Sequence, residues 1–219
     1  MIAIPLTLSQ RVLLIIALLM LVWYVIGMWY NRRQSIRVLN WLREGVVPLG
    51  GETQAAWIGT AASGARIVVS RAYPPFRQLE ITYLLESREL FPLWLVNLLR
   101  GKRDEVTIKA LLRSPRQGVV EVVAPGSRIE RSLRQDSRAA WHWGQGPYGL
   151  RVACRGSQGK ALSAAITSFL QKHKLSLYRF SCRKESPHLL IHARLAGLVD
   201  QSPATSFFED LALIFSQPR

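Results

Sequence analysis

Residues 12–30 read VLLIIALLMLVWYVIGMWY, a run of 19 residues without a charged side chain. At about 1.5 Å per residue, such a run forms about 28 Å of helix, which matches a hydrocarbon core of about 30 Å. Its aromatic residues gather toward the C-terminal end, where aromatic rings prefer the interface between membrane and water. The run therefore predicts a transmembrane helix at 12–30.

The sequence that follows the run indicates an uncleaved, single-pass signal anchor. A cleaved signal peptide has a shorter apolar region and a small-residue cleavage site, but here the run continues into Asn31 and two arginines. The arginines begin a juxtamembrane cluster, which consists of Arg32, Arg33, Arg37 and Arg43. Because cytoplasmic flanks are rich in Lys and Arg, we expect residues 1–11 outside the cytoplasm and the C-terminal domain in the cytoplasm, at the cell inner membrane.

The remainder of the 219 residues can form one sizeable domain, or two smaller ones that share a core. Residues 31–44 are expected to continue the helix, and 46–51 form a hinge rich in Gly and Pro. Strands are predicted at 54–60, 66–73, 77–86, 105–113 and 118–124, a helix at 87–100, and a linker or short helix at 125–138. The fold class is therefore α+β, with a mainly antiparallel sheet, and 52–136 is its first half.

The second half, 137–219, has a clearer pattern: strand 150–155, helix 160–173, strands 175–183 and 188–194, and helix 204–216. The glycine-rich run at 144–149 is expected to be a hairpin loop beside packed aromatic residues. An order of β-α-β-β-α is most of a ferredoxin-like unit. Whether the two halves share one sheet stays open at this point.

The net charge of +15 is concentrated, because nine Lys or Arg and no carboxylate lie between Ser137 and Lys184. Strand alternation places five arginines on the sheet face opposite the helices, and we call these the basic face: Arg151, Arg155, Arg179, Arg183 and Arg194. Such a face could bind lipid head groups, nucleic acid or an acidic partner. The favoured alternative is a solvated face, or one paired with carboxylates of the first half. Nucleic acid is disfavoured, because alternation turns Tyr178 and Phe180 inward, away from any base.

Residues 90–99 are apolar nearly all round, with Leu90, Phe91, Trp94, Leu95 and Leu98 as the candidate interfacial residues. The segment is too short to span a membrane. A core helix is the favoured interpretation, and a helix that lies in the membrane interface is the alternative.

The sequence predicts neither a metal nor a cofactor. Cys154 and Cys182 lack a metal-binding or disulfide pattern, and His188 and His192 would lie about 13 Å apart on a strand at about 3.3 Å per residue. The stretch 156–160, GSQGK, lacks the first glycine and the Ser or Thr of a phosphate-binding loop. No paired-carboxylate, G-x-S-x-G or Cys–His pattern points to an enzyme.

These features favour a non-enzymatic accessory, assembly or scaffold subunit that acts at the membrane through association with other proteins. The first alternative is a module that binds anionic ligands through the basic face, lipid head groups rather than nucleic acid. The second alternative is an uncharacterised membrane-tethered enzyme.

Overall fold

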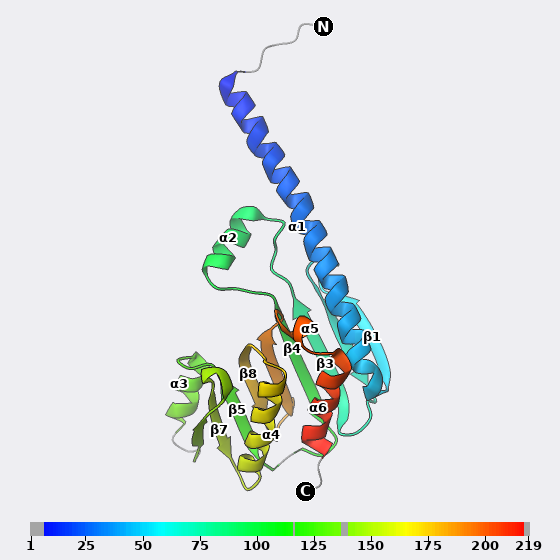
Figure 1. Cartoon of the computed structure of the whole chain (residues 1–219), viewed down its shortest axis with the longest axis vertical. Coiled ribbons are helices and arrows are strands. Elements are labelled where there is room, and N and C mark those ends of the chain that lie inside the picture. The colour runs from blue at the N-terminus through cyan, green and yellow to red at the C-terminus, as the bar shows by residue number, and fades with distance from the viewer. Residues whose placement is uncertain (1–6, 116, 137–139, 217–219) are drawn as a thin grey trace.

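The computed structural model describes residues 7–115, 117–136 and 140–216, so residues 1–6 of the expected extracytoplasmic N-terminus lie outside the described ranges. Helix α1 (Leu8–Val46) begins at a capping box formed by Thr7 and Gln10. Every residue from Leu8 to Ile26 except Trp23 is exposed, whereas the C-terminal part of the helix packs on the domain. The predicted membrane helix and its extension are thus one helix, long and apolar enough to span a membrane (Figure 1).

Nine strands of the described chain form one sheet in the order β1-β2-β3-β4-β9-β8-β5-β7-β6, and every neighbouring pair is antiparallel. The strands are β1 (Glu52–Trp57), β2 (Gly64–Ser70), β3 (Phe76–Leu84), β4 (Glu105–Leu112), β5 (Val119–Val123), β6 (His142–Gln145), β7 (Arg151–Arg155), β8 (Leu177–Cys182) and β9 (Leu189–Arg194). The α+β prediction is confirmed, and the two halves share this sheet.

The helices after α1 are α2 (Phe91–Leu99), α3 (Arg128–Gln135), α4 (Gly159–Lys172), α5 (Leu198–Gln201) and α6 (Ala204–Ser216), with 3-10 turns at Val47–Leu49 and Pro147–Gly149. The C-terminal part of α1 packs with α4 and α6 over one face of the sheet (Figure 1). The short helix α3 lies beside the opposite face, where its Leu133 lines a pocket with Arg155 and Arg183. Helix α2 stands apart from the sheet, beside α1.

The second half contains its elements in the predicted order, but its strand order is not that of a ferredoxin-like unit. In such a unit, the strand after β8 would return between β7 and β8. Instead, β5 occupies that position and β9 pairs with β4. The sequence of β5 explains its place, because its five residues include four valines and all five are buried, as suits an interior strand.

The C-terminal part of α1 is firmly attached to the core. Val38 and Leu42 are fully buried, and each such side chain stabilises the fold by about 1.5–3 kcal/mol. The indole Nε1 of Trp41 donates a 2.9 Å hydrogen bond to the carbonyl of Ser202. A Cβ at Gly45 would lie 2.5 Å from the Phe208 ring, so only glycine allows this approach of α1 to α6. The domain therefore packs directly on the C-terminal part of α1.

Candidate membrane interface

A stripe of residues four apart on α1 meets the segment that leads into α2. The stripe consists of Trp23, Gly27, Asn31 and Ser35, which lie on one face of a helix. The indole Nε1 of Trp23 donates a 2.7 Å hydrogen bond to the carbonyl of Arg88. A Cβ at Gly27 would lie 2.6 Å from that same oxygen, so the glycine lets the loop touch the helix backbone. The last residue of the stripe, Ser35, contacts the sheet. The hydroxyls of Ser35 and Tyr83 lie 2.8 Å apart, and burial raises the pKa of Tyr83.

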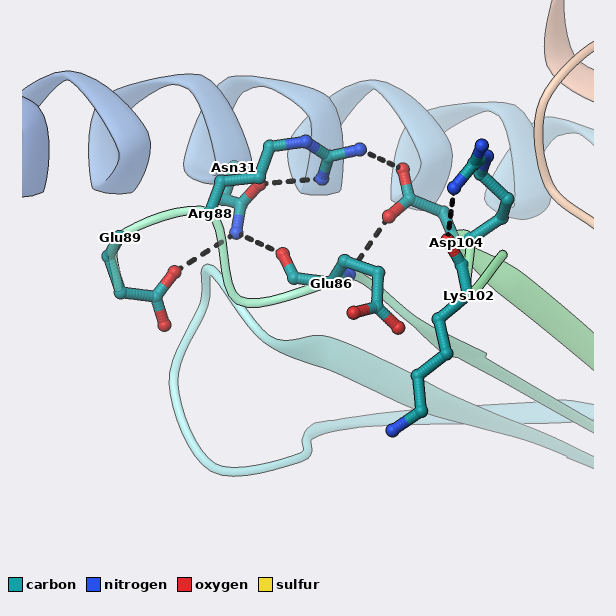
Figure 2. Close-up of polar contacts among 7 residues, drawn as sticks. Asn31, Glu86, Arg88, Glu89, Lys102 and Asp104 are labelled. Carbon is teal, nitrogen blue, oxygen red and sulfur yellow. Dashed lines mark hydrogen bonds and ion pairs between the residues drawn. The ribbon is translucent and has the colours of Figure 1, made fainter. Parts of the chain in front are cut away.

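The side-chain amide of Asn31 is buried and satisfied at both ends. Its Nδ2 donates to the carbonyl of Glu86 at 2.8 Å and to Oε2 of Glu89 at 3.2 Å, and its Oδ1 accepts from Nη1 of Arg88 at 2.8 Å (Figure 2). A buried amide without partners would be costly, so these bonds hold the loop against α1. The sequence gives Asn31 no visible role beyond ending the apolar run.

Arg88 extends this network to Asp104, so that it reaches both ends of the excursion, by which we mean the segment 86–104 that leaves the sheet and contains α2. Its Nη2 forms a 2.7 Å ion pair with Oδ2 of Asp104, whose Oδ1 accepts the backbone N–H of Glu86 at 2.9 Å (Figure 2). Its guanidinium carbon also lies 5.2 Å from the centre of the Tyr30 ring. Glu86 precedes α2 and Asp104 follows it, so both ends of the excursion are joined to each other and to α1. We call Asn31, Glu86, Arg88, Glu89 and Asp104 the clamp.

Helix α2 exposes its apolar side chains, so the interpretation as a core helix is wrong. Exposed side chains are Leu90, Phe91, Leu93, Leu95, Val96, Leu98 and Leu99, and only Trp94 among the candidate interfacial residues is half-buried. The one buried residue of α2 is the polar Asn97. A contiguous apolar surface of this kind marks a contact with protein or membrane.

The contact between α2 and α1 falls inside the apolar run. The Trp23 ring centre lies 4.8 Å from that of Phe91 and 5.5 Å from that of Trp94. Trp23 precedes Tyr30 by seven residues, which is about 10 Å along a helix at about 1.5 Å per residue. Helix α2 therefore lies beside the apolar run and not beyond its end (Figure 1).

The structure divides the juxtamembrane cluster. Arg32 and Arg33 are exposed directly after the apolar run, and the Arg33 guanidinium carbon lies 5.5 Å from the Trp29 ring centre. Arg37 is paired with Asp200 of α5. Arg43 is exposed further along α1, beside the domain. Only Arg32 and Arg33 thus stand at the end of the apolar run.

The basic face surrounds a buried carboxylate. Glu121 of β5 is fully buried and accepts from Nε of Arg179 at 3.1 Å, from Nε of Arg183 at 2.6 Å and from the Ser181 hydroxyl at 2.6 Å. Arg155 stacks on Trp141 with its guanidinium carbon 4.8 Å from the ring centre, and Arg151 is half-buried. The five arginines therefore do not form one open patch, and two of them pair with a carboxylate of the first half.

The inward placement of Tyr178 is wrong. A bulge between Leu177 and Arg179 breaks the alternation of β8, so Tyr178 joins the outer face. Its ring centre lies 4.9 Å from that of His192, and its hydroxyl accepts from Nε of Arg194 at 3.1 Å. Phe180 is buried, as predicted.

Sequence reasoning missed a polar cluster between the end of α4 and α6, in which His173 and Ser202 are buried. Nδ1 of His173 lies 2.9 Å from the Ser202 hydroxyl and its Nε2 lies 2.8 Å from Oδ2 of Asp210, which Lys172 also contacts at 2.6 Å. Burial lowers the pKa of His173. Although burial raises the pKa of Asp210, its hydrogen bonds with Lys172 and His173 lower it overall. No local motif could reveal residues this far apart in the chain.

Serine, histidine and aspartate also form the catalytic triads of hydrolases, but Ser202 is buried here and its hydroxyl is not placed to meet a substrate. The cluster instead joins the end of α4 to α6. In the described part of the chain, no group of three His, Cys, Asp or Glu side chains could hold a metal ion. Cys154 and Cys182 are buried.

Comparison of the sequence with models of known protein families gives no match, and comparison with curated proteins gives none either.

Proposed function

We propose that this chain is a single-pass membrane protein whose α+β domain lies against the cytoplasmic face of the cell inner membrane, where it serves as a non-enzymatic accessory, assembly or scaffold subunit. One observation carries the proposal: the clamp holds the exposed apolar helix α2 beside the apolar run of α1. In a bilayer spanned by the run, α2 lies in the interfacial layer and covers its leucines with lipid.

Two contacts with the bilayer restrict the domain more than one does. A single helix with a flexible exit lets a domain rotate and swing, but α1 passes into the core without a break and α2 adds a second contact to one side. The domain therefore presents a fixed face to other membrane proteins. Such a fixed orientation suits assembly with partners in the same membrane.

Association is tested by purification of the tagged full-length chain from its own membranes in a mild detergent. The proposal predicts stoichiometric recovery of at least one other membrane-associated protein. Recovery of the chain alone, at every detergent concentration that preserves the fold, would count against a role in assembly.

The cytoplasmic orientation rests on Arg32 and Arg33 at the end of the apolar run. Alkaline phosphatase fused to the C-terminus should be inactive, since this enzyme is active only outside the cytoplasm. An active fusion would reverse the orientation and leave the contact of α2 with lipid untouched.

A second candidate function is the binding of anionic lipid head groups near α2. Arg32, Arg33, Arg100 and Lys102 are exposed on the segments that flank the apolar surface. Binding of the detergent-purified chain to anionic vesicles should weaken as salt is raised, because such contacts are electrostatic. The same affinity at low and high salt would exclude this function.

A further inference from the structure

The strand β6 leaves one edge of the sheet open. In the described ranges it pairs with β7 alone, and the backbone N–H of Gly146 donates to the carbonyl of Leu150 at 2.8 Å. Hydrogen-bonded pairs alternate along an antiparallel ladder, so Gly144 and His142 also face β7 with their backbone groups. The N–H and C=O groups of Trp143 and Gln145 therefore point outward, as a template for another strand.

A groove of about 450 Å³ lies between β6 and α4, over the face of the β6–β7 pair that α4 covers, with Val152 and Cys154 of β7 among its lining residues. Gly144 forms part of the strand wall, and a Cβ at this position would meet nothing within 4 Å. The missing side chain leaves space for a side chain of an incoming strand.

The residues of α4 that line the groove are polar or have small side chains. Lys160, Ser163 and Thr167 of α4 line it, whereas Leu162, Ile166 and Phe169 of the same helix are buried in the core. Helix α4 thus has one face committed to the fold and another that borders the groove. The hydroxyls of Ser163 and Thr167 can donate hydrogen bonds to a carboxylate that enters the groove.

The charge around the groove selects the partner. Lys160 is among the lining residues, which include no carboxylate. Of the nine Lys or Arg between Ser137 and Lys184, Lys160 is the one among the lining residues, since Arg155, Arg179 and Arg183 lie on the opposite face of the sheet. An acidic segment is attracted to such a surface, and a basic one is repelled.

We propose that an extended, acidic segment of a partner protein pairs with the outward backbone groups of Trp143 and Gln145, adds a strand to the sheet outside β6, and places a side chain over Gly144 in the groove. Strand addition supplies affinity through backbone hydrogen bonds and specificity through alternate side-chain pockets. The inference rests on the proposed role in assembly, for which it supplies the chemistry of the partner.

The test uses the full-length chain in lipid nanodiscs and a displayed library of random peptides of about ten residues, which span more than β6 at about 3.4 Å per residue. Selected peptides should be rich in Asp and Glu, and hydrogen exchange should show that a bound peptide protects the amides of Trp143 and Gln145. A selection without acidic enrichment, or protection elsewhere alone, would overturn the proposal.

Two variants locate the site. Gly144→Val places a side chain in the groove at a position where a Cβ meets nothing within 4 Å, and Lys160→Glu reverses the charge in the first turn of α4, where a carboxylate suits the helix dipole. Each should weaken binding of the selected peptide by about tenfold or more, measured by fluorescence anisotropy. The control is Lys109→Glu, an equal charge change at an exposed site on β4. Equal affinity for all four proteins would overturn the proposal.

The two proposals fail in different ways. If the chain is recovered alone from its membranes, the role in assembly fails. If wild type and Gly144→Val recover the same partners in the same amounts, only the groove fails. If Gly144→Val instead dissociates a homo-oligomer of the chain, a second copy occupies the groove and the proposed acidic partner is wrong.

Discussion

Helices α2 and α6 are both rich in large apolar residues, yet α6 buries them and α2 exposes them. Helix α6 buries Phe207, Phe208 and Leu211 completely against α1, α4 and the sheet. Helix α2 exposes nearly all its apolar residues and buries Asn97. Composition alone therefore does not decide burial. What differs is the attachment: α6 is held by its apolar face, whereas α2 is held at its ends by polar groups of the clamp, which leaves its apolar surface free.

The largest expected effect compares one side chain of each helix. Phe207→Ala should lower the free energy of unfolding by about 3–5 kcal/mol, since it opens a cavity in the core. Leu95→Ala should change it by less than about 0.5 kcal/mol, since Leu95 is already exposed. Denaturant unfolding in detergent measures both. Similar losses for the two variants would remove the distinction between the helices.

The next largest effect is expected from a substitution that breaks the clamp. Arg88→Ala leaves the Asn31 amide oxygen and the Asp104 carboxylate without their partner, at a cost of about 1.5–3 kcal/mol. Hydrogen exchange of the α2 amides should then accelerate, while exchange in α6 stays slow. The control is Arg66→Ala, which breaks an exposed ion pair with Glu80 worth at most about 1 kcal/mol. Unchanged exchange in α2 would show that the clamp does not hold it.

A smaller effect follows from pH and concerns the contact between the end of α4 and α6. Because burial lowers the pKa of His173 in the folded state, the unfolded chain binds a proton more readily. Stability should fall as the pH drops below about 6.5, the usual value for His, and continue to fall until the folded pKa is passed. Asp210 adds no loss in this window, since its lowered pKa shifts its own effect to more acidic pH. His173→Gln should flatten the profile, and an equal slope in the variant would assign the effect elsewhere.

The sequence predicted where helices and strands lie along the chain better than which strands lie side by side in the sheet. Period and length located the membrane-length helix, most strands and α6, because local hydrophobic patterns are set by nearby residues. Strand β6 was missed, since its four residues, His142–Gln145, include a glycine and no β-branched side chain. The insertion of β5 between β7 and β8 depends on contacts between distant segments, which periodicity does not report.

The candidate sites were predicted less well, for related reasons. The sequence leaves the basic face either open or paired with carboxylates of the first half, because nothing local links Arg179 and Arg183 to Glu121, about 60 residues earlier in the chain. Strict alternation predicts an inward Tyr178, because alternation takes no account of the bulge in β8. The apolar character of 90–99 was plain, but its exposure depends on the clamp, whose members are scattered between Asn31 and Asp104.

The central claim is that α2 lies in lipid while α6 does not, and nitroxide accessibility tests it most directly. Leu95→Cys and Leu213→Cys place labels on two exposed leucines, one on each helix, and the parent protein with buried Cys154 and Cys182 is the control. In nanodiscs, the label at position 95 should be more accessible to oxygen than to a water-soluble nickel chelate, and the label at position 213 should show the reverse. Preferential access of the nickel chelate at both positions would contradict the account.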